Sequence, residues 1–583
     1  MSKINGTNGS KASDPRLKVI IVGAGVSGIL MAYKLKTFLP QRVVITVLEK
    51  NSDLGGTWFE NRYPGCACDV PSHLYQFSFK PNPEWSQFFA TSQEIQRYLK
   101  DVTQEFDLEK YIEYNTTVQR AEWDERDSIW RITVDGSRTL EADIFVNATG
   151  ILNNPQIPQI PGLSSFQGPV LHTANWDDSV ELTGKRVAMI GAAASAIQVL
   201  PKIQKICKHV DVHIRTPSWI TTPVGIEDLS DLNPVYTPQQ QYEFRSNPLS
   251  YLHTRKGLES QFNNMFKAFF RGAPEQCVIR EKITERMTTI IKDEALRKNL
   301  IPDFDVGCRR INPGESWLKA LQESNVTPIF DEIEKITSDG IQCRGKVRCA
   351  DILITATGFN TTFRPRFPII GRKARNLQDI WQSEPMSYMG IGVSGFPNYL
   401  VFLGPNTPIS NGSVLGPLEA TSDYFIRLLR KVIRERIKVF DIRPESQHDF
   451  DLHTQGFMKN MVWTGTCRSW FKRGIDGRVT ALWPGSSLHY MQVLAENKWE
   501  NYNWEYKGNR FDYWEKGFSW IEEPHQDQLG IEEAESQHCS TTPRPGADLS
   551  YYLWAGTPLA LSNSPVETNR KGTGSQNATV VPV

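Results

Sequence analysis

The sequence predicts an α/β fold with two Rossmann-like dinucleotide-binding domains and a helical insertion. Three observations predict it. A glycine-rich turn at residues 23–28 (GAGVSG) lies between a β-branched run and a helical segment. A related turn at residues 191–196 (GAAASA) has the same setting. An Ala-Thr-Gly triplet follows a buried apolar run in each half, ending at Gly150 and at Gly358, where the chain is expected to return to its nucleotide-binding sheet.

Length and charge limit the classes of protein and partner. A chain of 583 residues is too long for one hydrophobic core and predicts two to four domains. Lys+Arg and Asp+Glu both number 65, so there is no net charge to attract nucleic acid. No apolar run reaches the length of a membrane span, which argues against stable membrane insertion. The sequence says nothing about oligomeric state.

The cysteines and the chain ends predict a cytoplasmic protein with reduced thiols. Nine cysteines is an odd number, no CxxC pair occurs, and Cys66 and Cys68 are too close for an ordinary disulfide or zinc pair. We therefore expect no metal site and no redox dithiol. Residues 1–15 are polar without the apolar core of a signal peptide, and the final residues match neither a prenylation nor a peroxisomal signal.

The first glycine turn belongs to a complete dinucleotide fingerprint. The strand Leu17–Val22 leads into it, a helix is expected over Ile29–Phe38, and the strand Arg42–Leu48 ends in Glu49. Gly23 permits the tight turn, Gly25 lets the backbone approach a pyrophosphate, and Gly28 lets helix and strand pack closely. Glu49 accepts ribose hydroxyls. An acid at this position favours FAD or NAD over NADP.

An aromatic and glycine-rich loop follows this unit. It contains residues 54–58 (LGGTW), 61–65 (NRYPG) and Asp69. Adjacent glycines there suggest backbone lying close to a ligand; the alternative is a Gly/Pro surface loop. Helical patterning then resumes over Ser92–Phe106, with Ser92 as the expected N-cap. Strands are expected at residues 117–123, 129–134 and 143–148.

The second turn belongs to a second unit with a different cofactor preference. A strand over Lys185–Ile190 precedes the turn, a helix over Ile197–Ile206 follows it, and the next strand ends in Arg215-Thr216. A base at that position suits a 2′-phosphate and hence NADP. Ala193 departs from the fingerprint, because its methyl group crowds the place where backbone approaches a pyrophosphate. Weak or altered pyridine-nucleotide binding is therefore an alternative.

The remainder of the chain supplies an insertion and a return to the first domain. Residues 225–305 have helical patterning and aromatic residues that we expect to be mostly core. Arg309 and Arg310 stand side by side in an otherwise uncharged run, which favours a functional role; the alternative is a pair of solvated surface arginines. Residues 395–406 are expected to return to the first domain, a helix is expected at 417–435, and the apolar residues 551–556 are expected to dock within a polar C-terminal tail. The expected boundaries are 1–16 disordered, 17–151 and 381–523 FAD-binding, 152–224 and 306–380 NADPH-binding, 225–305 helical insertion, and 524–583 tail.

A stretch between the two turns carries a resemblance to a known family. Phe166, Gly168, His172, Trp176 and Asp177 form the pattern FxGxxxHxxxW followed by Asp. This pattern resembles the fingerprint of the type I Baeyer–Villiger monooxygenases, in a fungal-like form. The resemblance spans about residues 17–490, including both turns, the loop with Asp69, and residues 307–310. It implies the two-dinucleotide-binding flavoprotein fold.

The resemblance implies roles for individual residues. Arg310 would be the catalytic arginine, with Asp69 as its partner, and Arg309 would stand where a lysine is common. His172 and Trp176 would organise a hinge. The residues expected to bind FAD are Gly23, Gly25, Val26, Ser27, Gly28, Glu49, Gly56, Thr57, Trp58, Asp69 and Tyr75. Those expected to bind NADPH are Gly191, Ala194, Ser195, Arg215, Thr216 and Arg309.

The activity implied is the conversion of a ketone into an ester or lactone. NADPH would reduce the flavin, and O₂ would add to give a C4a-peroxyflavin that attacks the carbonyl. The aromatic insertion and C-terminal loops suit a bulky apolar ketone, whether cyclic, polycyclic or terpenoid. Two alternatives remain at this point: an oxygenase that makes N- or S-oxides, which usually has Tyr or Phe where Trp176 stands, and a non-catalytic flavin-binding protein.

Overall fold

The computed structural model describes residues 16–407, 411–473 and 477–514, together with Gly517 and Ser550. Nearly all of them belong to one unit, Met1–Tyr513. The predictions for residues 1–15 and for the apolar run at 551–556 lie outside the described residues. Within the described part, no helix is both long and apolar enough to span a membrane, and no group of His, Cys, Asp or Glu is arranged to hold a metal ion.

The first sheet is parallel and combines strands from distant parts of the chain, in the order β19-β7-β1-β2-β3. The prediction that residues near 400 return to this sheet is confirmed, since β19 pairs with β7. β1 is central, and its last four residues are buried. The strands are β1 Leu17–Val22, β2 Val43–Leu48, β3 Ile112–Glu113, β7 Ile144–Asn147 and β19 Tyr399–Val401.

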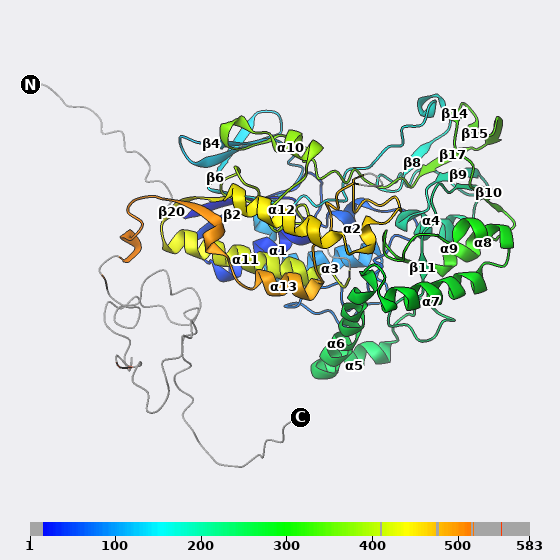
Figure 1. Ribbon diagram of the computed structural model, residues 1–583, viewed down its shortest axis with the longest axis horizontal. Coiled ribbons are helices and arrows are strands. Elements are labelled where there is room, and N and C mark those ends of the chain that lie inside the picture. Colours follow the sequence, from blue (N-terminus) through cyan, green and yellow to red (C-terminus); the bar gives the residue numbers. More distant parts are fainter. Residues whose placement is uncertain (1–15, 408–410, 474–476, 515–516, 518–549, 551–583) are drawn as a thin grey trace, which may run out of the picture. The chain divides into compact units, whose positions relative to one another are not determined.

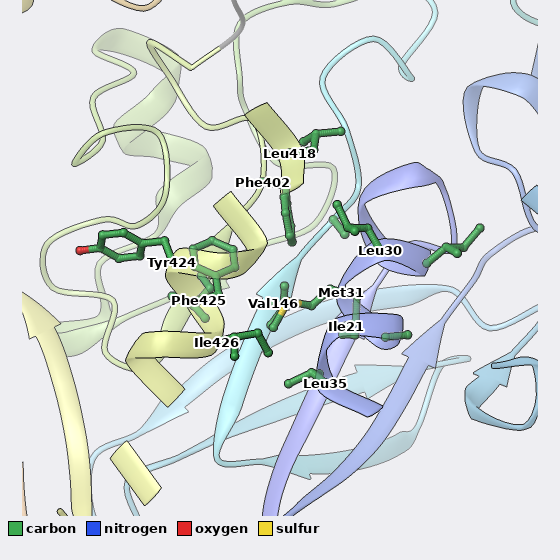
Figure 2. Close-up of a cluster of buried hydrophobic side chains, with 14 of the residues drawn as sticks. Ile21, Leu30, Met31, Leu35, Val146, Phe402, Leu418, Tyr424, Phe425 and Ile426 are labelled. Carbon is green, nitrogen blue, oxygen red and sulfur yellow. The ribbon is translucent and has the colours of Figure 1, made fainter. Parts of the chain in front are cut away.

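Two helices cover one face of the first sheet (Figure 1). α1 (Val26–Phe38) follows the first glycine turn, and α11 (Leu415–Arg434) packs beside it. Figure 2 shows Leu30, Met31 and Leu35 of α1 meeting Phe425 and Ile426 of α11 above the strands. All five side chains are buried, so this layer fixes the start of α1 and with it the turn. α1 begins three residues earlier than expected, because the turn runs directly into the helix.

The second sheet is also parallel, in the order β13-β10-β9-β17-β8. The helix after its glycine turn is α4 (Ala194–Ile203), which again begins three residues before the expected position and packs on α9 (Glu315–Ala320). The predicted pair of nucleotide-type sheets is therefore confirmed. The strands are β8 Val170–His172, β9 Arg186–Ile190, β10 His209–His213, β13 Val326–Ile329 and β17 Ile352–Thr355.

Smaller sheets flank these two. A four-stranded sheet has the order β18-β4-β5-β6, a three-stranded sheet the order β14-β15-β16, and two further pairs are β11-β12 and β20-β21. Their bounds are β4 Val118–Asp124, β5 Ile129–Val134, β6 Arg138–Ala142, β18 Ile369–Ile370, β14 Lys335–Thr337, β15 Gly340–Cys343, β16 Lys346–Cys349, β11 Ile220–Thr221, β12 Asn312–Pro313, β20 Ile437–Ile442 and β21 Tyr502–Tyr506.

The segment expected to be a helical insertion is helical. α5 begins with a capping box in which Thr237 and Gln240 bond each other's backbone N–H, and a proline follows at the first helical position. α3 is capped by Thr91, whose hydroxyl accepts from the Glu94 N–H, so the prediction of Ser92 as N-cap is wrong by one residue. The remaining helices are α2 Thr57–Glu60, α3 Ser92–Glu105, α5 Pro238–Ser246, α6 Pro248–Asn264, α7 Pro274–Ile290, α8 Glu294–Leu300, α10 Leu377–Ser383, α12 Pro444–Met458 and α13 Ser487–Leu494.

Candidate active site

The first glycine turn forms a cradle that is open on one side. A Cβ atom on Gly28 would lie 1.9 Å from the Gly23 carbonyl oxygen, so only glycine allows α1 to approach the turn this closely. At Gly25, by contrast, the nearest atom to an added Cβ would be the Gly56 Cα at 3.6 Å, and both glycines line a cavity. The turn therefore presents bare backbone and the N-terminus of α1 to that cavity, an arrangement suited to phosphate.

Glu49 stands at the end of β2 beside this cradle. Its side chain is buried, and its carboxylate accepts hydrogen bonds from the backbone N–H groups of Ala24 (2.7 Å) and Asn51 (2.9 Å). Burial raises the pKa of Glu49, and the two N–H groups oppose that rise. The bond to Ala24 locks the carboxylate against the glycine turn. This is the place at which the fingerprint requires an acceptor for ribose hydroxyls.

A cavity of about 560 Å³ joins this cradle to the two adjacent arginines. Most residues expected to hold the first cofactor line it together with both arginines. They are Gly23, Gly25, Val26, Ser27, Glu49, Gly56, Thr57, Trp58, Asp69, Tyr75, Arg309 and Arg310. Gly28 does not line it, because it packs against the turn. The second-turn residues Gly191, Ala194, Ser195, Arg215 and Thr216 also lie outside it.

Asp69 and Arg310 form a forked ion pair at this cavity. The guanidinium donates from Nη2 to both carboxylate oxygens at 2.7 Å and from Nε to Oδ2 at 3.0 Å. The Asp69 side chain is 22% exposed and that of Arg310 is 48% exposed. The negative charge of Asp69 raises the pKa of Arg310, which keeps the guanidinium protonated. A pair this geometrically constrained fixes both the charge and the direction of the arginine.

A disulfide joins Cys308, the residue before the two arginines, to Cys467. The prediction that all thiols are reduced is therefore wrong for this pair. Their Cα atoms are 6.2 Å apart although 159 residues separate them in sequence. Trp463, Trp470 and Phe471, on the segment that carries Cys467, line the cavity. The bond thus ties the arginine segment to one wall of the site.

Arg309 bonds the loop after β10 rather than Asp69. Its Nη1 donates to the Pro217 carbonyl at 3.1 Å, and burial together with the nearby charge of Arg215 lowers its pKa. Among the described residues neither Arg309 nor Arg215 has an ion-pair partner. Two neighbouring guanidiniums without a carboxylate form a site for a doubly charged anion such as a phosphate.

The second turn is exposed to solvent at Ala193, the position that departs from the fingerprint. Ala193 is the N-cap of α4, and its side chain is exposed, as is that of Ala194. Ser195 follows, with its hydroxyl oxygen 3.1 Å from that of Thr173. The Ala193 methyl group is therefore exposed to solvent at the start of α4, which has no side-chain cap.

The stretch that carries the family-like pattern contributes β8 to the second sheet and does not line the cavity. Phe166 is buried in a small core beneath that sheet, and Val170–His172 forms its edge strand β8. The His172 ring is buried, accepts from the Ala174 N–H at Nδ1 (3.0 Å), and has a lowered pKa because of burial. Trp176 packs against the second core, and Asp177 bonds Ser179. Together with Gly168, these residues do not line the cavity.

Several cavity residues were not predicted as site residues. Phe262 and Phe269 belong to aromatics that we expected to be core, yet both line the cavity. Arg366 lines it as well, and burial lowers the pKa of its guanidinium while Glu60 and Glu49 raise it. The aromatic density of the insertion was the only available signal for the first two. Nothing in the local sequence marks Arg366.

Comparisons with known proteins add to this geometry. A model of the flavin-binding monooxygenase-like family matches residues 16–284. The FAD-binding monooxygenase stcW of Emericella nidulans is 40% identical over 504 residues, which are 84% of this chain and 83% of that protein. A Baeyer–Villiger monooxygenase of Pseudomonas aeruginosa is 34% identical over 493 residues, covering 84% of this chain and 92% of that protein. The structure of cyclohexanone monooxygenase from Rhodococcus sp. Phi1 bound to NADP⁺ has a TM-score of 0.74 at 24% identity, over 84% of this chain and 100% of that chain.

Proposed function

The chain belongs to the Baeyer–Villiger monooxygenases, within the flavin-binding monooxygenase-like family, and from this membership we propose how its own residues perform the reaction. The protein is an FAD- and NADPH-dependent enzyme that inserts one atom of O₂ beside a ketone carbonyl to give an ester or a lactone. The observation that carries our assignment of residues is the forked Asp69–Arg310 pair on the cavity that also contains the glycine cradle and Glu49.

The residues present fit both cofactors. Gly25 and Gly56 leave bare backbone where a pyrophosphate needs close approach, and Glu49 is fixed where ribose hydroxyls need an acceptor. We propose that the first turn holds FAD. The cations Arg215 and Arg309, which have no carboxylate partner among the described residues, suit the 2′-phosphate of NADPH, as does the N-terminus of α4, which has no side-chain cap. When bound, FAD reduced by NADPH supplies the activated oxygen for the reaction.

Arg310 supplies a permanent positive charge where the reaction needs one. A guanidinium stays protonated throughout the working pH range, so it can stabilise negative charge that develops on oxygen without giving a proton away. Its half-exposed face lines the cavity, while Asp69 holds two of its nitrogens. Asp69 also offsets the cost of placing a cation in a partly dry site. We propose that Arg310 binds the carbonyl oxygen of the ketone as it becomes anionic.

The aromatic and apolar part of the cavity wall suits a bulky apolar ketone. Phe262, Met265 and Phe269 come from one segment of this wall. Trp463 and Phe471 come from the segment tied by the disulfide. Burial of an apolar substrate against aromatic rings is favourable, at roughly 25 cal/mol for each Å² removed from water. A dry site also protects the activated oxygen from loss as hydrogen peroxide. We propose that His172, at the end of β8, and Trp176, which packs against the second core, govern movement between the parts of the protein built on the two sheets.

A product assay tests this proposal. The FAD-loaded enzyme is given NADPH, ¹⁸O₂ and a panel of linear, cyclic and polycyclic ketones, with an aryl sulfide in a separate reaction. We expect an ester or lactone that has gained one labelled oxygen, with larger cyclic ketones converted fastest. NADPH oxidation with sulfoxide as the only oxygenated product, and no ester from any ketone, would contradict it. The variant Arg364→Ala, which removes an exposed arginine outside the cavity, is the matched control for arginine substitutions.

A further inference from the structure

We call the part of the protein built on the first sheet the first half and the part built on the second sheet the second half. A short segment of the first half is buried in the second half. Tyr63 is 9% exposed and Cys66 is 6% exposed, and both belong to the hydrophobic core formed by α4 and the second sheet. The residues on either side, Thr57 and Asp69, line the cavity instead. The loop that carries Asp69 is therefore anchored to the second half before it reaches the site.

Gln198 of α4 makes the polar part of this anchor. The Tyr63 hydroxyl donates to Gln198 Oε1 at 2.8 Å, and Gln198 Nε2 donates to the Ala67 carbonyl at 2.9 Å. Gln198 lies about one turn after Ser195, in the middle of α4. Both ends of its amide are thus used to hold the 63–67 segment, and both bonds join residues more than 130 positions apart.

Backbone packing makes the anchor rigid. Gly65 has φ of +86°, and a Cβ added there would lie 2.7 Å from the Gln198 carbonyl oxygen and 2.9 Å from Lys202 Cγ. The loop backbone therefore rests directly on α4. Cys68 N–H then bonds the Ala90 carbonyl, which fixes the path from Ala67 to Asp69. Displacement of α4 would move the loop with it, since little space remains between them.

We propose that Gln198 is a positioning residue, through which α4 sets the orientation of Asp69 and hence of Arg310. The connection runs from Gln198 to the Ala67 carbonyl, along two residues of chain to Asp69, and from there to the guanidinium. The proposal rests on the proposed function, in which α4 begins at the NADPH-binding turn. It makes the orientation of the Arg310 guanidinium depend on the position of α4 relative to the loop that carries Asp69, whether or not substrate is present.

Three variants of the full-length, FAD-loaded enzyme test it. Gln198→Leu keeps the size of the side chain and removes both hydrogen bonds. Tyr63→Phe keeps the ring packing and removes one. Gln204→Leu is the control, because Gln204 is the C-cap of α4 and its side chain bonds Asn325, which precedes β13 of the second sheet (2.9 Å). One lost hydrogen bond is worth about 1 kcal/mol, so kcat should fall by about 5-fold in Tyr63→Phe and by about 10-fold or more in Gln198→Leu.

The accompanying readouts separate positioning from folding. In Gln198→Leu the KM for the ketone should change by less than about 2-fold, while a larger share of NADPH is oxidised without ester formation. The change in the flavin absorbance spectrum on adding NADP⁺ should be smaller than in the wild type, and this readout needs no ketone turnover. Gln204→Leu should match the wild type in kcat, coupling and spectrum.

Two results would overturn the proposal. The first is that Gln198→Leu lowers the melting temperature and kcat only as much as Gln204→Leu does, while ester formed per NADPH and the flavin absorbance change on adding NADP⁺ stay as in the wild type. The second is a Tyr63→Phe variant identical to the wild type in every readout, which also decides the matter if Gln198→Leu does not fold. Failure of the wild type itself to make ester would count against the proposed function, whereas the spectral comparison would still report on Gln198.

Discussion

The guanidinium of Arg310 is held by the carboxylate of Asp69 through contacts of 2.7 to 3.0 Å that join positions 241 residues apart in sequence. Each partner comes from a different half of the chain, and both face the cavity that contains the glycine cradle. The pair therefore forms only when the two halves are correctly placed, and the chemistry of the site depends on long-range folding rather than on one local motif.

Replacement of Arg310 by alanine should abolish most ester formation while FAD stays bound. Loss of one preorganised group that stabilises developing negative charge costs on the order of 100- to 1,000-fold in kcat. The measurement is ester formed per NADPH consumed, with bound flavin quantified by absorbance. Arg310→Lys should recover little, because a lysine keeps the charge but cannot form the fork with Asp69. Arg310→Ala with wild-type kcat would show that the charge lies elsewhere.

Replacement of Arg309 or Arg215 by alanine should weaken the use of NADPH and leave the use of NADH unchanged. Each guanidinium is expected to make a charge-assisted hydrogen bond to the 2′-phosphate, and such a bond is worth about 1.5 to 3 kcal/mol. The KM for NADPH should therefore rise by on the order of 10- to 100-fold in each variant. Steady-state kinetics with both nucleotides provides an internal control. Equal use of NADPH and NADH by the wild type would remove the basis for assigning these arginines.

The disulfide between Cys308 and Cys467 should stabilise the fold. A disulfide typically contributes about 2 to 4 kcal/mol to stability, so Cys467→Ser should lower the free energy of unfolding by about that amount. Denaturant unfolding with and without a dithiol measures it, and the variant should no longer respond to the dithiol. Cys277→Ser, which removes an exposed free thiol, is the control. Peptide mapping of unreduced protein that finds both thiols free would refute the bond.

His73 should make the protein less stable in mild acid. The ring is buried, its Nδ1 lies 2.7 Å from the Tyr251 hydroxyl oxygen, and burial followed by the charge of Arg255 lowers its pKa to about 4. In the unfolded chain the His73 ring is protonated below about pH 6.5, whereas in the folded protein it stays neutral down to about pH 4. The contribution of His73 to the free energy of unfolding is therefore fully present above about pH 6.5 and is lost as the pH falls towards 4. His73→Gln should show a shallower decline in unfolding free energy between about pH 7 and about pH 5 than His253→Gln, an exposed-site control. Equal slopes in the two variants would show that His73 does not contribute.

The local part of the site was predictable from sequence, because it depends on neighbouring residues. The glycine turn and the acid Glu49 belong to one strand–helix–strand unit, and Gly23, Gly25 and Glu49 line one cavity. The exact starts of the helices were less predictable. Thr91 and Ser92 are both good caps, and only the backbone conformation decides between them.

The remaining features depend on contacts that sequence spacing does not reveal. Pairing of Asp69 with Arg310 came from family resemblance, since nothing in either local sequence indicates the other. The disulfide was missed because an odd cysteine count and the absence of CxxC favour free thiols, whereas Cys308 and Cys467 are brought together by packing of distant segments. Gln198 has an ordinary helical position in the sequence, and its two bonds exist only because the 63–67 loop lies against α4.

The burial of Tyr63 and Cys66 in the second core has a consequence for engineered hybrids of this enzyme with its relatives. A crossover placed between the two sheets along the sequence would give the hybrid a Tyr63–Cys66 segment from one parent and an α4 surface from the other. The direct contact of Gly65 with the backbone of Gln198 leaves no room to absorb a mismatch in shape. Exchange of the second half should therefore be accompanied by exchange of residues 61–69. The segments to be exchanged together are those that pack against one another, although they are far apart in the sequence.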